Sequence, residues 1–363
     1  MNADFILAIG ELGKEKGIDP ELLFQAVEEA LVTAYKKNFG SNQNVRVDMN
    51  KVTGELHIYA QRHIVAEVGD DPNEISLEEA RKIDPRYEVD DIVETEVTPR
   101  NFGRIAAQNA KQVVVQRIRE AERGMVFEKF SSRENDIVTG IIQRMENKNV
   151  YIDLGKAEAI LTPNEQIPGE IYQYHDRMKT YIVEVKKTSK GPQIMVSRPH
   201  PGLLKRLFEL EVPEIHDGLV EIKSVAREPG MRSKISVYTK DENIDPVGAC
   251  VGHKGMRVQT IVNELRGEKI DIVKYSSEPD QYVANALSPA KVVSTEVLEE
   301  EKICRVIVPD YQLSLAIGKE GQNARLAAKL TGWKIDIKSE SQAAEEAEQG
   351  AQEVGVAYEA DED

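Results

Sequence analysis

The stretch that decides the fold occurs twice in this chain. Its first copy contains the loop Val251-Gly252-His253-Lys254-Gly255, and its second copy contains Ile317-Gly318-Lys319-Glu320-Gly321. Each loop is followed by a helix-like segment and then by Leu-x-Gly-x-Lys-Ile-Asp-Ile, at residues 265–272 and 330–337, where six of eight positions are identical. One helical segment and two strand-like segments precede each loop. The sequence therefore predicts a duplicated α-β-β-α-α-β unit, with Gly-x-x-Gly between its last two helices.

A Gly-x-x-Gly loop by itself could be a tight turn between two helices. Here it is duplicated, it lies between two short helical segments, and each copy carries a basic residue. Glycine has no Cβ, so a phosphate backbone can come close to the loop, and the N-terminus of the following helix attracts negative charge. The type II KH module has this arrangement, and its loop clamps about four nucleotides of single-stranded RNA. We therefore expect two KH modules in tandem.

The candidate RNA-binding residues lie in the two loops and at the start of the helix after each loop. Basic side chains there would add charge opposite the phosphates, and His253 could contact RNA either neutral or charged. Glu320 weakens the attraction of the second loop for phosphate, so we expect the first loop to depend more on charge. The predicted RNA-binding residues are Gly252, His253, Lys254, Gly255, Arg257, Gly318, Lys319, Glu320, Gly321, Gln322, Asn323 and Arg325.

Residues 132–200 contain five short strand-like runs that are separated by Gly, Pro and charged turns. Five strands in fewer than 70 residues are typical of a small barrel, and the OB-fold is common at this size. Tyr151 could stack a base, and nearby lysines could line a nucleic-acid face. The same pattern fits other barrels with solvated lysines, so this interpretation stays open.

Residues 1–131 predict an α+β domain. Asp19-Pro20 is typical of a helix start, Ser76-Leu77-Glu78-Glu79 is a capping box, and residues 45–49, 55–65 and 92–97 alternate as strands do. A long helix after Gly103 carries several arginines. Such a basic face is more often a solvated helix surface than a binding face.

The net charge of −16 argues at first against nucleic acid, but it is unevenly distributed. Residues 339–363 hold nine acidic residues and no basic one, whereas residues 131–338 are balanced. We therefore expect residues 341–363 to form a disordered acidic tail, either a solubilising end or a mimic of phosphate that competes for a basic site.

The sequence shows no signature of an active site. It lacks a Walker loop, a Gly-x-Ser-x-Gly motif, a His-Glu-x-x-His motif and a Rossmann fingerprint, and its histidines lack metal-ligand spacing. We expect no catalytic residue, no cofactor and no metal. Cys250 and Cys304 lie in apolar contexts and are expected in the core of a reduced, cytoplasmic protein. No apolar run is long enough to span a membrane.

Long stretches of the second half resemble a known family. Residues 207–215, 226–230, 245–252, 267–273, 316–319 and 321–337 are similar to the paired KH modules of the NusA family of bacterial transcription elongation and termination factors. The resemblance implies the following order of domains. An RNA polymerase-binding domain occupies residues 1–131, an OB-fold domain of ribosomal-protein type residues 132–200, a first KH domain residues 201–276, a second KH domain residues 277–340, and the acidic tail residues 341–363.

The resemblance also implies a function. The protein would bind core RNA polymerase, nascent single-stranded RNA and other termination or antitermination factors, and it would modulate pausing, intrinsic termination and antitermination. It would act as a monomer in the cytoplasm and would not be an enzyme. Two alternatives remain open at this point, a phosphorolytic exoribonuclease and a ribosome-associated RNA-binding protein, because both classes also use such modules.

Overall fold

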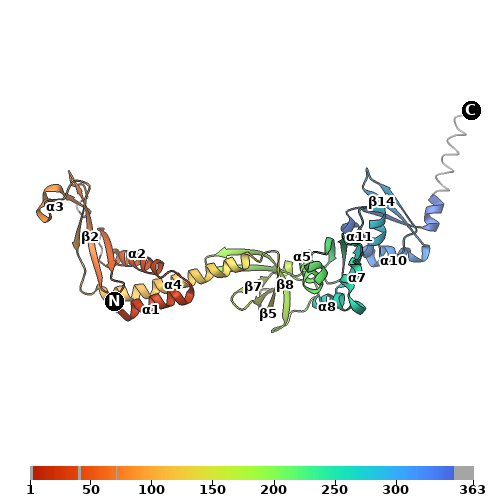
Figure 1. Ribbon diagram of the computed structural model, residues 1–363, viewed down its shortest axis with the longest axis horizontal. Helices are drawn as coiled ribbons and strands as arrows, with labels where there is room; N and C mark the ends of the chain where they lie inside the picture. The colour runs from red at the N-terminus through yellow and green to blue at the C-terminus, as the bar shows by residue number, and fades with distance from the viewer. Residues whose placement is uncertain (1–2, 40–41, 71, 347–363) are drawn as a thin grey trace, which may run out of the picture. The chain divides into compact units, whose positions relative to one another are not determined.

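The computed structural model describes residues 3–39, 42–70 and 72–346. The chain divides into two compact units, Met1–Glu128 and Lys129–Asp363, and each is described separately (Figure 1). The sequence places its first domain boundary at 131/132, three residues later than this division. No helix within the described ranges combines the length and apolarity needed to cross a bilayer.

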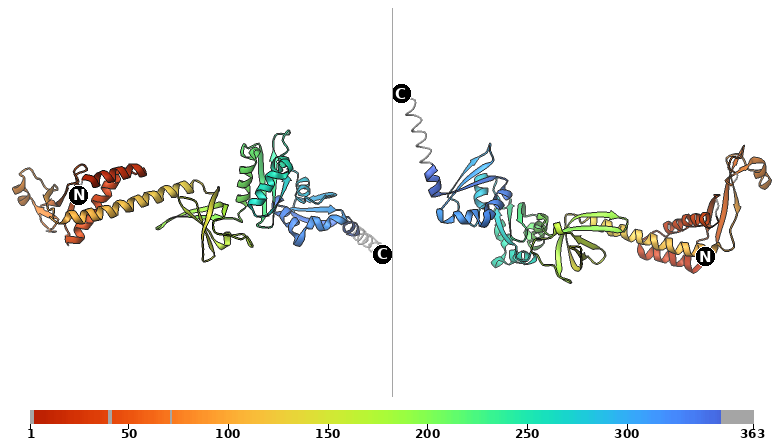
Figure 2. Two further views of the ribbon diagram at one scale, coloured as in Figure 1. Left: turned by 90° about the horizontal axis from the view of Figure 1, so that it is seen from below. Right: turned by 180° about the vertical axis from the view of Figure 1, so that it is seen from behind.

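Within the described residues, the first unit contains four helices and a four-stranded sheet. Its elements are α1 (Ala3–Lys16), α2 (Pro20–Phe39), β1 (Asn44–Met49), β2 (Leu56–Val65), β3 (Glu74–Ser76), α3 (Leu77–Ile83), β4 (Ile92–Glu96) and α4 (Phe102–Ser131). Helices α1 and α2 lie alongside α4 in both views of Figure 2, and Val27, Leu31, Phe102 and Ala106 are fully buried where these helices pack. Burial of this apolar surface stabilises the unit independently of the rest of the chain.

The predicted helix starts in this unit are present. The side chain of Asp19 accepts a hydrogen bond from the backbone N–H of Glu21 at 2.9 Å, and Pro20 is the first residue of α2. The hydroxyl of Ser76 accepts from the N–H of Glu79 at 3.3 Å, as the capping box predicts. Both contacts satisfy donors that the first turn of a helix leaves without intrahelical partners.

The second unit begins with a closed five-stranded barrel. Its strands are β5 (Ile137–Glu146), β6 (Asn149–Asp153), β7 (Glu158–Leu161), β8 (Arg177–Thr188) and β9 (Gly191–Ser197). Around the barrel they follow the order β5-β6-β7-β9-β8, and only the β7–β9 pair is parallel. Alternate residues such as Val150 and Ile152 are buried inside it, which is why the period-2 pattern was visible in the sequence. This confirms the predicted OB-fold barrel.

Two modules of the same topology follow the barrel. The first contains α5 (Pro201–Glu211), α6 (Pro213–His216), β10 (Val220–Glu228), β11 (Arg232–Thr239), α7 (Pro246–Val251), α8 (Met256–Glu264) and β12 (Lys269–Lys274). The second contains α9 (Pro279–Ala286), β13 (Ser294–Leu298), β14 (Ile303–Val308), α10 (Leu313–Ile317), α11 (Gln322–Thr331) and β15 (Lys334–Ser339). In each sheet the middle strand pairs antiparallel with the first strand and parallel with the last. The duplication predicted from the repeat is thus confirmed.

The cores of the second unit run across module borders. Tyr181 of the barrel packs into the core of the first KH module, and Ala226 and Val273 of that module pack into the core of the second. Cys250 and Cys304 are fully buried in these cores, and burial raises the pKa of the Cys250 thiol to about 12. Both are therefore small core residues, as expected, and Cys250 is not a reactive thiol.

The tail prediction needs one correction. Residues 341–346, at the start of the predicted disordered tail, are helical. The Ser341 hydroxyl donates to Asp310 at 2.9 Å, and Lys338 forms an ion pair with Glu346 at 2.5 Å, so local contacts hold this turn of chain in place. The rest of the predicted disordered tail, residues 347–363, lies outside the described residues.

Candidate nucleic-acid interface

The two Gly-x-x-Gly loops have the same backbone conformation. The first glycines, Gly252 and Gly318, have φ/ψ of 73°/177° and 77°/170°, a region essentially restricted to glycine. The third residues, Lys254 and Glu320, are left-handed at φ 49° and 54°. The last glycines are left-handed as well and immediately precede α8 and α11. The repeat therefore builds one loop geometry twice.

The side chains inside the loops point to solvent. His253, Lys254, Lys319 and Glu320 are exposed, and within the described residues neither lysine forms an ion pair. Each loop leads into the N-terminus of a helix of nine or ten residues, where N–H groups and the helix dipole favour an anion. Six of the predicted site residues, the four glycines together with Lys254 and Lys319, thus lie in two turns, each with an exposed lysine and a helix N-terminus.

Arg257 does not lie free beside the first loop as predicted. Its Nη1 donates to the Ala249 carbonyl at 2.6 Å and to the Glu214 carboxylate at 2.9 Å. Its aliphatic stem lies under Gly252, because a Cβ at that glycine would stand 2.6 Å from the Arg257 Cγ. Arg257 therefore braces the end of α7, and Glu214 balances its charge.

Asn323 is not an exposed RNA contact, which corrects the prediction for this residue. It is 4% exposed, and its Nδ2 donates to the Leu287 and Ala316 carbonyls at 3.0 Å. Asn323 stands two residues after the second glycine of its loop, as Arg257 does in the first copy. The same position in each copy thus stabilises the helix that ends at the loop, by different chemistry.

Arg325 and Gln322 contact the other KH module. Arg325 Nε donates to Glu228 Oε1 at 2.8 Å, and Gln322 Nε2 donates to Glu228 Oε2 at 2.9 Å. Glu228 is the last residue of β10, in the first KH module. The prediction treated both side chains as belonging to the second loop alone, because nothing in the local sequence shows which residue from 94 or 97 positions away will lie beside them.

The barrel offers an aromatic side chain that is already covered on one face. The Arg144 guanidinium lies 3.8 Å from the centroid of the Tyr151 ring and holds Glu158 through two hydrogen bonds, at 2.8 and 3.1 Å. A base could therefore stack on Tyr151 only by displacing Arg144 or by using the opposite face. The base-stacking role considered for Tyr151 stays a hypothesis.

A cluster of charged residues around the buried Arg198 joins the barrel to the first KH module, and the sequence analysis missed it. Arg198 is fully buried and pairs with Glu170, itself 3% exposed, at 2.5 Å. Arg198 also donates to the Glu264 carbonyl at 3.1 Å, and Lys179 pairs with the Glu264 carboxylate at 3.0 Å. Charged residues are mostly exposed, so the sequence carried no signal that these would be buried. The pairs fix the loop-bearing module to the barrel.

Arg227 and Glu268 form a second buried pair beside this junction. They share two hydrogen bonds of 2.8 Å, and Arg227 also donates to the Arg198 and His200 carbonyls. His200 caps α5 with its Nδ1, which accepts from the Gly202 N–H at 3.0 Å, and burial lowers the pKa of this imidazole. A neutral His200 is required for that acceptor role.

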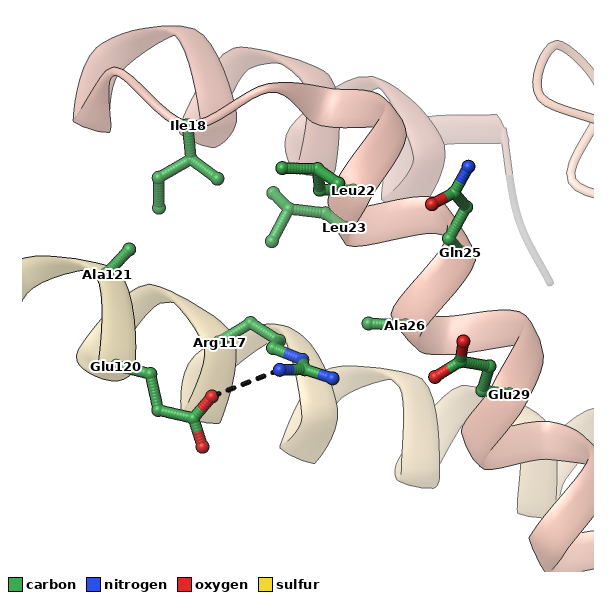
Figure 3. Close-up of a pocket in the computed structure, with 9 residues that line it drawn as sticks. All are labelled: Ile18, Leu22, Leu23, Gln25, Ala26, Glu29, Arg117, Glu120 and Ala121. Carbon is green, nitrogen blue, oxygen red and sulfur yellow. Dashed lines mark hydrogen bonds and ion pairs between the residues drawn. The ribbon is translucent and has the colours of Figure 1, made fainter. Parts of the chain in front are cut away.

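The first unit has an open recess between α2 and α4. It has a volume of about 380 Å³ and an apolar floor that includes Ile18, Leu22, Leu23 and Ala121 (Figure 3). Arg117 and Glu120 form an ion pair at its rim with an N–O distance of 3.3 Å, so this part of the basic face of α4 is neutralised. Among the described residues no group of three or more His, Cys, Asp or Glu side chains is placed to hold a metal ion.

Comparison with known proteins accounts for nearly the whole chain. Family models match the NusA N-terminal domain at residues 4–124, the S1 RNA binding domain at 131–197, the NusA-like first KH domain at 198–275 and the NusA-like second KH domain at 279–345. The order of these matches is the order of the domains in the structure.

Full-length relatives agree with the family models. The chain is 65% identical over 345 residues to the transcription termination/antitermination protein NusA of Halalkalibacterium halodurans, covering 95% of this chain and 90% of that protein. It is 64% identical to the protein of the same name from Bacillus subtilis (95% and 93% covered) and 42% identical to that from Thermus thermophilus (92% and 89% covered). The chain therefore belongs to the NusA family of transcription termination/antitermination proteins.

Proposed function

We propose that this chain binds nascent single-stranded RNA through its two KH loops, assisted by the barrel, and binds core RNA polymerase through its first unit. By doing both it modulates pausing, intrinsic termination and antitermination, together with other termination factors. The observation that carries the proposal is the identical, exposed Gly-x-x-Gly backbone in two modules, each leading into a helix N-terminus. The RNA-binding residues proposed are Gly252, His253, Lys254, Gly255, Gly318, Lys319, Glu320 and Gly321.

The loop geometry favours the RNA backbone over a particular base sequence. Phosphates can approach the glycines closely, because glycine has no Cβ. At Gly255 the space that a Cβ would face is open, with no other atom of the protein within 4 Å. The helix N-terminus and Lys254 or Lys319 then supply positive potential. Each contact is weak, so binding depends on several contacts being made by one chain.

Attachment to polymerase supplies the missing affinity in this proposal. A module held close to the RNA exit region experiences a high effective concentration of transcript, so weak loops suffice. A loop that is basic only locally is therefore sufficient for RNA binding. This explains how a chain of net charge −16 can bind RNA. We further propose that the chain acts as a monomer in the cytoplasm and performs no chemistry on the RNA.

The test replaces the exposed loop side chains in both modules, as H253D/K254D combined with K319D/E320D. Aspartate tolerates the left-handed conformation of positions 254 and 320, so the loops should keep their shape. We expect the affinity for a short unstructured RNA to fall at least tenfold, with a small change in melting temperature. The RNA should be recovered intact, as expected of a protein that is not an enzyme.

A matched control is K302D. Lys302 is exposed, has a left-handed φ of 52° and lies in the turn between β13 and β14, outside both loops. The K302D variant makes the same Lys-to-Asp replacement on the same backbone conformation. Its affinity for RNA should stay close to that of the unaltered protein. Unchanged affinity in the double-loop variant would contradict the proposal.

A further inference from the structure

The two KH loops are surrounded by different charges. At the first loop, Arg257 pairs with one carboxylate, Glu214, and Lys254 forms no ion pair within the described residues. At the second loop, Lys319 and Arg325 are balanced by Glu320 and by Glu228. The basic side chains beside the second loop are therefore countered by two carboxylates although the backbone is the same, and one of these carboxylates, Glu228, comes from the neighbouring module.

Glu228 is held firmly against the helix that follows the second loop. Its two carboxylate oxygens accept from Arg325 Nε at 2.8 Å and from Gln322 Nε2 at 2.9 Å. The Glu228 side chain is only 16% exposed, so water screens its charge less than it would on an open surface. The bond from Arg325 lowers the pKa of Glu228, which keeps the carboxylate ionised at neutral pH.

Arg325 lies at the mouth of the loop. Its Nη1 donates to the Glu320 carbonyl at 2.8 Å and stands 3.7 Å from the place where a Cβ on Gly321 would be. The side chain is 49% exposed, and within the described ranges its Nη2 donates no hydrogen bond. A phosphate bound over Gly321 would therefore meet one side of the guanidinium while Glu228 holds another. Phosphate and carboxylate attract the same cation.

We infer that Glu228, a residue of the first KH module, sets the strength with which the second KH loop binds RNA phosphate, by neutralising Arg325. This inference rests on the proposed function of the loops. It makes the two modules unequal binders, because the basic side chains beside the second loop face two carboxylates, Glu228 and Glu320, whereas Arg257 beside the first loop pairs with Glu214 alone. It also couples the modules, since RNA bound at the second loop weakens a contact that joins the two KH modules.

The test is E228Q in the full chain. Glutamine keeps the shape of the side chain and removes its charge, so Arg325 becomes an unbalanced cation. We expect the affinity for an unstructured single-stranded RNA to rise at least about two- to fivefold, because a fully exposed ion pair already spans that range and Glu228 is less exposed. The slope of log K against log salt should steepen by up to about 0.7, the value for one additional neutralised phosphate.

The matched control is E221Q. Glu221 lies on the same strand, β10, and pairs with Lys223, so the variant removes the same charge. At a rise of about 3.3 Å per residue it lies roughly 23 Å along the strand from Glu228. Its RNA affinity and salt slope should match those of the unaltered protein.

Combined variants locate the effect. The gain from E228Q should persist with H253D/K254D, which disables the first loop, and should vanish with K319D/E320D or with R325Q. An E228Q affinity equal to or weaker than that of the unaltered protein would overturn the inference, since a purely structural Glu228 predicts weaker binding and a lower melting temperature. Failure of the proposed function would give a different result. H253D/K254D and K319D/E320D would then leave the RNA affinity unchanged, which would overturn both the proposed function and the inference about Glu228.

Discussion

The two glycines of the second loop have different roles. Gly318 adopts a φ/ψ of 77°/170°, and a Cβ there would stand 2.8 Å from the backbone N of Asn323. Gly321 is left-handed as well, at 75°/12°, but a Cβ there would touch only the flexible end of Arg325, at 3.7 Å. The first glycine is thus required by the fold, whereas the second leaves space over the surface that is proposed to hold phosphate.

The pair G318A and G321A tests this division. We expect G318A to lower the free energy of unfolding by about 3 kcal/mol, from strain plus a clash with fixed backbone, and G321A by about 1 kcal/mol. G321A should still reduce RNA affinity severalfold, because its methyl group occupies the approach to the loop. Denaturant unfolding and RNA titration of both variants provide the measurement, and equal stability losses would show that the close contact at Gly318 is relieved.

At the scale of elements, buried charge holds the barrel and the first KH module together. Arg198 and Glu170 are both buried, whereas Arg144 and Glu158 make a similar two-bonded pair on the open surface of the same barrel. On the surface, water solvates two separated charges almost as favourably as the two charges stabilise each other in an ion pair. A buried carboxylate that loses its partner has no such compensation. The two pairs should therefore differ strongly in their effect on stability.

The prediction compares R198M with R144M. We expect R198M to destabilise the second unit by about 3–5 kcal/mol, because it leaves Glu170 buried with reduced compensation, and R144M by less than about 1 kcal/mol. Thermal or denaturant unfolding of both variants, followed by a signal from the second unit, makes the comparison. Similar small losses from both would mean that water enters the junction and solvates Glu170.

For the whole molecule, the division at 128/129 separates two sets of tasks in our proposal. The first unit has its own core of helices and strands, and the loops, the barrel and the buried ion pairs all lie in the second. Because each unit has a hydrophobic core, we expect each to fold by itself. The proposal therefore assigns polymerase binding to the first unit and RNA binding to the second.

Fragments of residues 1–128 and 129–363 test this assignment. The first should bind core polymerase without RNA, and the second should bind RNA while holding polymerase weakly. Neither fragment, nor their mixture, should lengthen pauses as the intact chain does, because the covalent link supplies the local concentration. Pause lifetimes in a transcription assay give the readout. Full pausing by residues 129–363 alone would mean that the RNA-binding unit acts on polymerase directly.

The sequence by itself determined the order of elements and the position of the two loops. Hydrophobic period, capping residues and glycine placement are local properties, so the barrel strands, the start of α2 and both Gly-x-x-Gly turns could be found from neighbouring residues alone. The repeat then showed that one topology was used twice, and the chain's composition showed that charge was concentrated in its last residues.

Only the tertiary structure decided which of the predicted side chains are exposed beside the loops and which have partners in the fold. Arg257 and Asn323 have types and positions suited to phosphate, yet they brace carbonyls at the ends of α7 and α10. Arg325 is balanced by Glu228 from 97 residues earlier, and Arg198 is buried against Glu170. The free energy of a charged side chain depends on burial and on which opposite charge lies near it, and both are set by segments that are distant in sequence.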